Sequence, residues 1–237
     1  MEEKRQPVIQ VKNLYKIFRV GDEKVRALNG VDLTIYKGEF CAIVGTSGSG
    51  KSTMLNMLAV LEKPTKGEVV VAGQHLENMT ENQLVKFRRE KVGFIFQSFN
   101  LLGTMNAIEN VALPLTFRGV DKKVREAKAV KMLKLVGLSK HMLHRPNEMS
   151  GGQQQRVGVA RALVLDPEII FADEPTGNLD TATEQEIIRI FRLLAEDFGK
   201  TVIVVTHSET VSRFSDERVL LEDGQLHRMP AAEAAGV

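Results

Sequence analysis

Gly45-Thr46-Ser47-Gly48-Ser49-Gly50-Lys51-Ser52 matches the phosphate-binding loop pattern G-x-x-x-x-G-K-[ST] at every position. The apolar run 40–44 before it is typical of a buried parallel strand, and the residues from Thr53 to Leu58 are typical of a helix. A strand, a glycine-rich loop and a helix together direct backbone N–H groups and a positive helix end toward phosphates. In this pattern Lys51 reaches the β- and γ-phosphates, and the Ser52 hydroxyl binds Mg²⁺. The alternative interpretation is a glycine-rich turn without a ligand.

The composition limits the class of protein. The 237 residues suffice for one large domain, or for a domain with a subdomain. The 32 Lys and Arg residues against 30 Asp and Glu give a net charge of +2, which provides no reason to expect a nucleic-acid partner. The single Cys41 excludes an internal disulfide and suits a reducing cytosol. The N-terminus does not resemble a signal peptide, and no apolar run approaches the roughly 20 residues that span a bilayer. We therefore expect a soluble protein that reaches a membrane only through a partner.

Two segments before the loop predict a small antiparallel sheet. Val8 to Leu14 and Val31 to Tyr36 alternate apolar and polar residues, which is typical of half-exposed strands, with a turn at Gly21-Asp22. Phe18 lies between them. An aromatic ring here can stack on an adenine, or it can simply pack in the sheet, and position alone favours packing.

A further strand, at 92–96, is followed by Gln97. A strand at 68–72 and a helix at 84–90 are also expected on the way to it. In an open α/β sheet, a polar side chain at the carboxyl end of a strand points into the ligand crevice. Gln97 is equally compatible with a plain strand end.

The segment 98–165 contains no convincing strand and predicts a helical insertion into the α/β fold. Within it, Ser150 is expected to cap a helix that runs through Leu163, and Ser150-Gly151-Gly152-Gln153 is either an ordinary cap or a second anion-binding helix end. The uncharged stretch 98–108 holds four large apolar residues, which either belong to the core or form an exposed interaction surface; these are Phe99, Leu101, Leu102 and Met105.

The α/β pattern then resumes with a buried strand that ends at Asp173-Glu174. Two adjacent carboxylates are costly if merely buried, but they are expected where a Mg²⁺ ion and a water are handled, with Asp173 near the metal and Glu174 as the base or water-orienting group. A helix at 181–198 is predicted to bury one face, and the β-rich run 201–206 ends at His207, which is equally compatible with a structural and a catalytic role. A last strand is expected near 219–221, and a frayed tail from Pro230.

Over about residues 8–228, the chain resembles the ATP-binding cassette (ABC) ATPases. The resemblance is carried by the order of the motifs, which are the phosphate loop, Gln97, the signature 150–153, Asp173-Glu174, Asp180 and His207. The finer pattern of 146–156 and 172–180 is similar to the branch of lipoprotein-releasing, macrolide-efflux, antimicrobial-peptide-resistance and cell-division ATPases. The resemblance implies an α/β P-loop ATPase core at 1–97 and 166–229 that includes an N-terminal antiparallel β subdomain. It also implies an inserted α-helical subdomain at 98–165 and a tail at 230–237.

The resemblance also implies roles for individual residues. The phosphate loop from Gly45 to Thr53 would bind the nucleotide, and Phe18 would stack on adenine, with Tyr15 a weaker candidate. Gln97 matches the residue that senses Mg²⁺ and the attacking water, and His207 matches the one that contacts the γ-phosphate. Ser150, Gly151, Gly152 and Gln153 match the signature that meets the γ-phosphate of the opposite subunit, whose phosphate loop Asp180 would face.

The implied protein is an ATPase whose two copies close head to tail on two Mg·ATP and drive a separate membrane permease from the cytoplasmic face of the membrane. An alternative is a soluble ABC ATPase that acts on nucleic acid or ribosomes. The DNA-repair type needs a long coiled coil between loop and signature, for which the chain has no room. An inactive scaffold is expected to have lost Lys51 or Glu174, and both are present.

Overall fold

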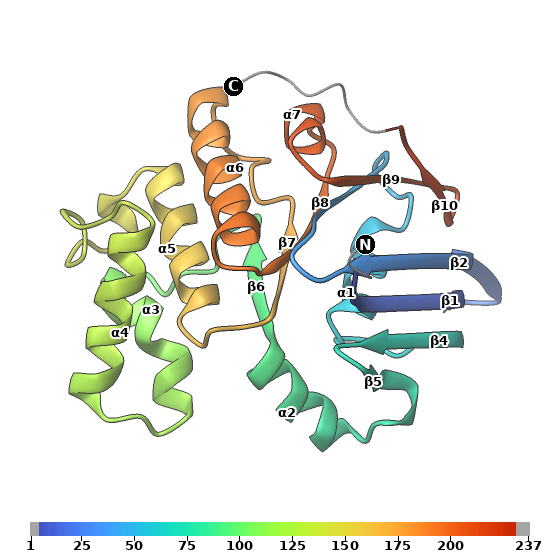
Figure 1. Cartoon of the computed structure of the whole chain (residues 1–237), viewed down its shortest axis with the longest axis horizontal. Helices are drawn as coiled ribbons and strands as arrows, with labels where there is room; N and C mark the ends of the chain where they lie inside the picture. Colours follow the sequence, from blue (N-terminus) through green and yellow to red (C-terminus); the bar gives the residue numbers. More distant parts are fainter. Residues whose placement is uncertain (1–4, 231–237) are drawn as a thin grey trace.

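The computed structural model describes residues 5–230, and a six-stranded sheet in the order β10-β9-β3-β8-β7-β6 lies at its centre (Figure 1). All neighbouring pairs are parallel except β10 with β9. The predicted α/β fold with a parallel sheet is confirmed. The strands are β3 (Phe40–Val44), β6 (Val92–Phe96), β7 (Ile169–Asp173), β8 (Thr201–Thr206), β9 (Glu217–Glu222) and β10 (Gln225–Arg228).

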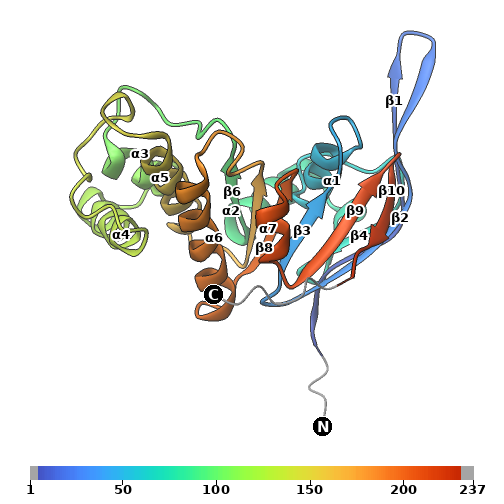
Figure 2. The same cartoon turned by 90° about the horizontal axis from the view of Figure 1, so that it is seen from above.

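A second sheet, in the order β2-β1-β4-β5, is antiparallel, as predicted. Its first two strands are longer than the predicted segments, because both continue beyond the alternating pattern into a hairpin arm closed at Gly21-Asp22. Figure 2 shows this arm projecting from the body of the molecule. Phe18 therefore lies within a strand, paired with Val25. The strands are β1 (Pro7–Val20), β2 (Glu23–Tyr36), β4 (Lys66–Val71) and β5 (Gln74–His75).

The large sheet separates two hydrophobic cores because successive side chains of a strand point to opposite faces. In β3, Cys41 and Ile43 belong to the core shared with α1 (Lys51–Leu58), α2 (Glu81–Lys91) and the small sheet, whereas Phe40 belongs to the other core. Burial raises the pKa of the Cys41 thiol. Helix α1 therefore packs between the two sheets, which fixes the phosphate loop that precedes it.

The segment 98–165 is helical, as expected, with α3 (Ala107–Phe117), α4 (Lys122–Leu135), a 3₁₀ turn (Pro146–Glu148) and α5 (Gly151–Leu163). These helices group at one side of the molecule (Figures 1 and 2). Their apolar residues join those of α6 (Thr181–Glu196) and one face of the large sheet in a single cluster. The division into a core at 1–97 and 166–229 and a helical subdomain at 98–165 stays a prediction.

The predicted helix 181–198 is wrong at its end. Helix α6 stops at Glu196 ahead of Gly199, which has a φ of +60°, and Phe198 is 48% exposed instead of buried. The other three predicted apolar positions are buried; these are Ile187, Phe191 and Leu194. A short helix α7 (Glu209–Arg213) and strand β10 were not predicted. Of the tail, 231–237 lies outside the described residues.

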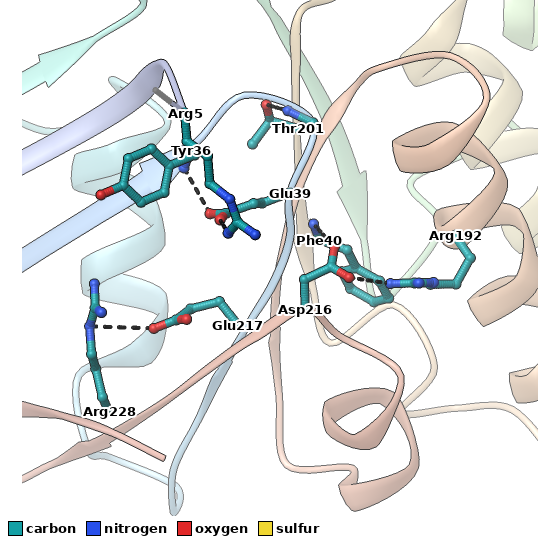
Figure 3. A network of polar contacts seen from close by, with 10 residues as sticks. Arg5, Tyr36, Glu39, Phe40, Arg192, Thr201, Asp216, Glu217 and Arg228 are labelled. Carbon is teal, nitrogen blue, oxygen red and sulfur yellow. Dashed lines mark hydrogen bonds and ion pairs between the residues drawn. The ribbon is translucent and has the colours of Figure 1, made fainter. Parts of the chain in front are cut away.

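A polar network holds the start of β3 (Figure 3). The Asp216 carboxylate accepts a hydrogen bond from the Phe40 N–H at 2.9 Å and binds the Arg192 guanidinium at 2.6 Å. Nearby, Glu39 accepts from the Tyr36 N–H at 2.8 Å and from Arg5 at 3.1 Å. These contacts join α6, β2 and the β8–β9 connection around the strand that leads into the phosphate loop.

Within residues 5–230, no helix combines the length and the apolar character that crossing a bilayer requires.

Candidate nucleotide-binding site

The phosphate loop connects β3 to α1 and lines a cavity of about 1090 Å³. Residues that directly follow β6, β7 and β8 complete the wall of the cavity. The cavity therefore lies at the carboxyl ends of strands β3, β6, β7 and β8. The lining residues are Thr46 to Thr53 with Phe18, Val25, Arg26, Ala27, Gln97, Glu174, His207, Asp223 and Gly224. The structure thus brings together the loop, Phe18, Gln97, Glu174 and His207, which the sequence singled out separately.

At two positions of the loop, neighbouring backbone atoms leave no room for a Cβ, so only glycine fits there. A Cβ on Gly45 would lie 2.3 Å from the carbonyl oxygen of Leu221, and one on Gly50 would lie 2.4 Å from that of Ala27. Gly50 also has a φ of +103° and caps α1 at its N-terminus. The loop therefore lies directly on β9 and β2, and no other residue type fits at these positions.

Lys51 is 8% exposed, and its Nζ donates to the carbonyl oxygens of Gly45 at 2.8 Å and Thr46 at 2.9 Å. The ammonium group is therefore held inside the loop, beside the N-terminus of α1. A buried cation next to a positive helix end makes the loop strongly attractive to an anion such as a phosphate.

Glu174 and His207 are in direct contact, although they lie on different strand ends. His207 Nδ1 is 2.9 Å from Glu174 Oε2, and the His207 backbone N–H donates to the same oxygen at 3.3 Å. The Glu174 side chain is 16% exposed and that of His207 is 67% exposed. Glu174 also has a φ of +45°, a strained conformation for a residue with a Cβ. Strain of this kind is typical of functional sites.

Asp173 lies behind Glu174, at the end of β7. Burial raises the pKa of the Asp173 carboxyl, and the charge of Glu174 adds to this, whereas the charge of Lys51 and a hydrogen bond with Ser52 oppose it. Its Oδ1 atom is buried without a hydrogen-bond partner. Buried polar atoms normally have a partner, so this oxygen and the adjacent Ser52 hydroxyl form a pair of hard oxygen donors that fit Mg²⁺.

Gln97 is exposed at the end of β6 and touches the turn that follows Glu174. The Asn178 amide donates to the Gln97 carbonyl oxygen at 3.3 Å, and a Cβ on Gly177 would lie 2.9 Å from Gln97 Nε2. Gln97 is therefore placed between the cavity and the turn 175–179.

The signature residues do not line this cavity. Ser150 caps α5: its Oγ accepts from the Gln153 N–H at 3.3 Å, and Gln153 Oε1 accepts from the Ser150 N–H at 3.0 Å. Asp180 caps α6, and its hydrogen bond from the Thr183 N–H lowers the pKa of its carboxyl. A Cβ on Gly152 would lie 2.2 Å from Thr183 Cγ2, so the two helix N-termini are in contact. Gly151, the first residue of α5, lies close to Leu179.

The two aromatic candidates have different surroundings. Phe18 lines the cavity, and Lys16 Nζ lies 5.1 Å from the centre of its ring. Tyr15 does not line it; its hydroxyl packs close to Gly30, and Lys66 Nζ lies 5.7 Å from the centre of its ring. The geometry favours Phe18 over Tyr15 as the stacking residue.

Sequence reasoning missed two residues that organise the turn 175–179. Gln155, fully buried in α5, donates its amide to the Pro175 carbonyl oxygen at 2.7 Å. Glu184, in the first turn of α6, accepts a hydrogen bond from the Thr176 hydroxyl at 3.0 Å. A Gln two positions after the signature and a Glu near a helix start carry no distinctive sequence pattern, so only the tertiary contacts identify them.

A second hollow, of about 750 Å³, lies at the opposite end of β3 and is lined by Arg5, Gln6, Tyr36, Lys37, Gly38, Glu39 and Asp216. Its carboxylates are already bonded to arginines and backbone N–H groups in the network of Figure 3. The two carboxylates of this hollow are therefore already paired within the structure.

A phosphate loop between a parallel strand and a helix, with an acidic pair at the end of a neighbouring strand, defines a P-loop nucleotide-binding protein. Comparison with known proteins narrows this class. Residues 28–177 match the family model described as ABC transporter. An ABC transporter ATP-binding protein of Thermotoga maritima is 48% identical over 219 residues, which cover 92% of this chain and 93% of that protein.

A macrolide export ATP-binding/permease protein, MacB of Chlorobaculum tepidum, is 46% identical over 217 residues, which are 92% of this chain but 33% of MacB. The solved dimeric post-hydrolysis state of the ATP-binding cassette MJ0796, bound to ADP and Pi, superposes with a TM-score of 0.87 at 43% identity, covering 97% of this chain and all of that one. The chain therefore belongs to the ABC transporter family, within the branch that the sequence pattern indicates. It is an ATP-binding cassette with the ATPase site of that family.

Proposed function

We propose that this chain is the ATPase subunit of a membrane transporter and that two copies close head to tail on two Mg·ATP. The observation that carries the proposal is the separation of the two anion-binding helix ends: the α1 end lines the cavity, whereas the α5 end at Ser150 does not. A second copy, related by two-fold symmetry, can bring its α5 end to the cavity and complete both sites with one contact. The dimeric state of the MJ0796 cassette supports this arrangement.

Within each site, the residues of the chain have separate tasks. Lys51 would exchange the carbonyl oxygens of Gly45 and Thr46 for the β- and γ-phosphates. Ser52 and Asp173 would hold Mg²⁺ together with Gln97, and the ion when bound neutralises charge on the phosphate oxygens. Glu174 would orient the attacking water and accept its proton, while His207 contacts the γ-phosphate and Phe18 stacks on adenine.

The membrane partner of the proposal is a separate permease, which would hold the cassette at the cytoplasmic face of the membrane. The MacB relatives support it, because their name combines an ATP-binding and a permease part and this chain spans about a third of their length. Transport is favoured over an action on nucleic acid because the net charge is only +2.

The permease would dock on the loop 98–106. Leu102 is 45% exposed there, whereas Leu101 packs against the core, so the apolar residues divide between the two interpretations that the sequence left open. Leu102 and the half-buried Met105 would line a groove for a helix of the permease. The loop directly follows Gln97, so a change at the γ-phosphate could be transmitted to the membrane.

The catalytic part of the proposal is tested with Glu174→Gln. The substitution keeps the shape of the side chain but removes the proton acceptor, so ATP binding should persist while turnover falls at least about a hundredfold. The ATP-bound dimer should then live long enough to elute as a dimer from a size-exclusion column. A variant that hydrolyses ATP at the wild-type rate would refute the role of Glu174.

The permease contact is tested by replacing Leu102 and Met105 together with Asp. The ATPase activity of the isolated protein should stay within about a few-fold, because neither residue lines the nucleotide cavity. Copurification with the permease and stimulation by it should be lost. Normal copurification would place the groove elsewhere, and an unfolded variant would show that these residues belong to the core.

A further inference from the structure

Glu184 joins two loops that leave neighbouring strands of the large sheet. Its Oε1 atom accepts a hydrogen bond from the Thr176 hydroxyl at 3.0 Å and another from the Ser208 hydroxyl at 2.7 Å. Thr176 belongs to the turn after β7, and Ser208 belongs to the turn after β8. One carboxylate oxygen on α6 therefore fastens both turns.

These are the turns that carry the two reactive side chains of the cavity. Thr176 follows Glu174 by two positions, and Ser208 directly follows His207. Glu174 and His207 in turn touch each other at 2.9 Å. The contact between them depends on the relative position of the two turns, and Glu184 links those turns from the side of α6.

Thr176 and Ser208, the two residues that Glu184 binds, are each held within their own turn. The hydrogen bonds to Glu184 therefore fix the position of one turn relative to the other. Thr176 is 4% exposed. The Ser208 N–H donates to Thr206 Oγ1 at 3.0 Å, and the Ser208 Oγ accepts from the Val211 N–H at 3.3 Å, which caps α7. Hydroxyl-to-carboxylate bonds are among the stronger hydrogen bonds in proteins, and this site has two on one oxygen.

We propose that Glu184 is a positioning residue of the ATPase reaction: it sets the spacing of the two turns so that Glu174 and His207 meet at the reacting phosphate. The inference rests on the proposed function, since it concerns the same site. It assigns no contact with the nucleotide to Glu184, which does not line the cavity. An error of about 1 Å in the placement of a reacting group can lower a rate about a hundredfold, so a link of this kind matters for the rate.

Two conservative substitutions show whether the length or the charge of the Glu184 side chain matters. Glu184→Gln keeps an oxygen at the same distance and loses the charge, whereas Glu184→Asp keeps the charge and is one methylene too short to reach both hydroxyls. Positioning through Oε1 predicts that Glu184→Gln retains most of the rate and that Glu184→Asp, like Glu184→Ala, loses about tenfold or more. Glu196→Ala, which removes a glutamate at the other end of α6 that pairs with Arg192, is the matched control and should keep the wild-type rate.

The measurement is the single-turnover rate constant of Mg·ATP hydrolysis at saturating protein, together with the Kd for ATP. A rate constant does not depend on the fraction of folded protein, so a general loss of stability would not change it. We expect slower hydrolysis in Glu184→Asp with a Kd for ATP within about twofold of the wild type.

A wild-type rate constant in Glu184→Asp and Glu184→Ala would overturn the inference, as would an equal loss in Glu184→Gln and Glu184→Asp. If Glu184→Ala does not fold, the Asp and Gln variants still decide the question. If the wild-type protein itself does not hydrolyse ATP, the proposed function is contradicted. If the wild-type protein hydrolyses ATP and only the pattern among the Glu184 variants differs from the expected one, the inference about Glu184 is contradicted and the proposed function is not.

Discussion

Asp173 places a carboxylate oxygen inside the protein without a hydrogen-bond partner, next to the charge of Glu174. Its pKa is raised in the folded state, so its contribution to stability is fully present below the pKa of the unfolded chain and is lost as the pH rises through the folded-state pKa. At neutral pH the protein without ligands therefore carries a penalty that Mg²⁺ would relieve.

We predict that Asp173→Asn raises the Tm of the ligand-free protein at pH 7–8 and has less effect near pH 4, because a lower pH favours the neutral carboxyl, whose pKa burial raises. ATP hydrolysis should be lost at the same time, since the proposed Mg²⁺ ligand is removed. Thermal unfolding of both proteins between pH 4 and pH 8, in the absence of Mg²⁺, shows whether the Tm of the variant is the higher one. Asp197→Asn, which removes an exposed carboxylate just after α6, is the control. An equal change in Tm at both ends of the pH range would contradict the assignment.

At the level of single residues, the sequence could predict those whose chemistry depends on a local pattern. The parallel sheet brings the ends of several strands to one edge, and the predicted site residues lie at those ends. Asp173 is the last residue of β7, and the phosphate loop, Gln97, Glu174 and His207 directly follow strands. Gln155 and Glu184 could not be predicted, because their function depends on partners 20 and 24 positions away in the chain. No local spacing encodes such contacts.

Among the elements, the loop 98–106 is held by one side chain of α3. Asn110 is 1% exposed; its amide donates to the carbonyl oxygens of Leu102, Met105 and Asn106, and its Oδ1 accepts from the Leu102 N–H at 2.8 Å. Asn110 thus binds the backbone of the second half of the loop, and the Arg161 guanidinium of α5 donates to the carbonyl oxygens of Phe99 and Asn100 in its first half.

We predict that Asn110→Ala destabilises the protein by about 1–3 kcal/mol, because several backbone groups lose their partner. Proteolysis in the loop 98–106 should become faster, and the exposed Asn82→Ala in α2 serves as the control for a surface Asn. An unchanged denaturation midpoint and an unchanged cleavage pattern would show that the loop is held by other contacts.

The reliability of the predicted elements follows their burial. Strands β3, β7 and β8 were predicted closely because apolar runs buried on both faces are distinctive. The apolar run of β6 was also predicted closely, although every second residue of it is only half-buried. The hairpin arm of β1 and β2 was missed because both of its faces are largely exposed, which removes the alternating pattern. Strand β10 was missed because it has four residues, of which Leu226 is half-buried and the other three are exposed, so it has no apolar pattern.

For the whole molecule, the proposed dimer predicts complementation between two inactive variants. A Ser150→Arg subunit lacks the helix end that it would offer to its partner, and a Lys51→Ala subunit lacks a working phosphate loop. Neither homodimer has a complete site, but the mixed dimer has one. Random mixing in equal amounts should therefore restore about a quarter of the wild-type ATPase rate if the sites act independently.

The readout is the ATPase rate against the mixing ratio, with a maximum near equal amounts. A flat curve would contradict either a shared site or independent sites. A cross-link between a Cys near Ser150 of one copy and a Cys near the phosphate loop of the other distinguishes these explanations, because it forms only if the two segments meet.

The pairing of β3 has a consequence for how the protein is made. This strand leads into the phosphate loop, but its neighbours in the sheet are β8 and β9, which belong to the last part of the chain. On the ribosome, the loop emerges long before the strands that fix it, and pairing across so many residues is slow. A growing chain therefore has no assembled nucleotide site until β8 and β9, residues 201–222, have also been made.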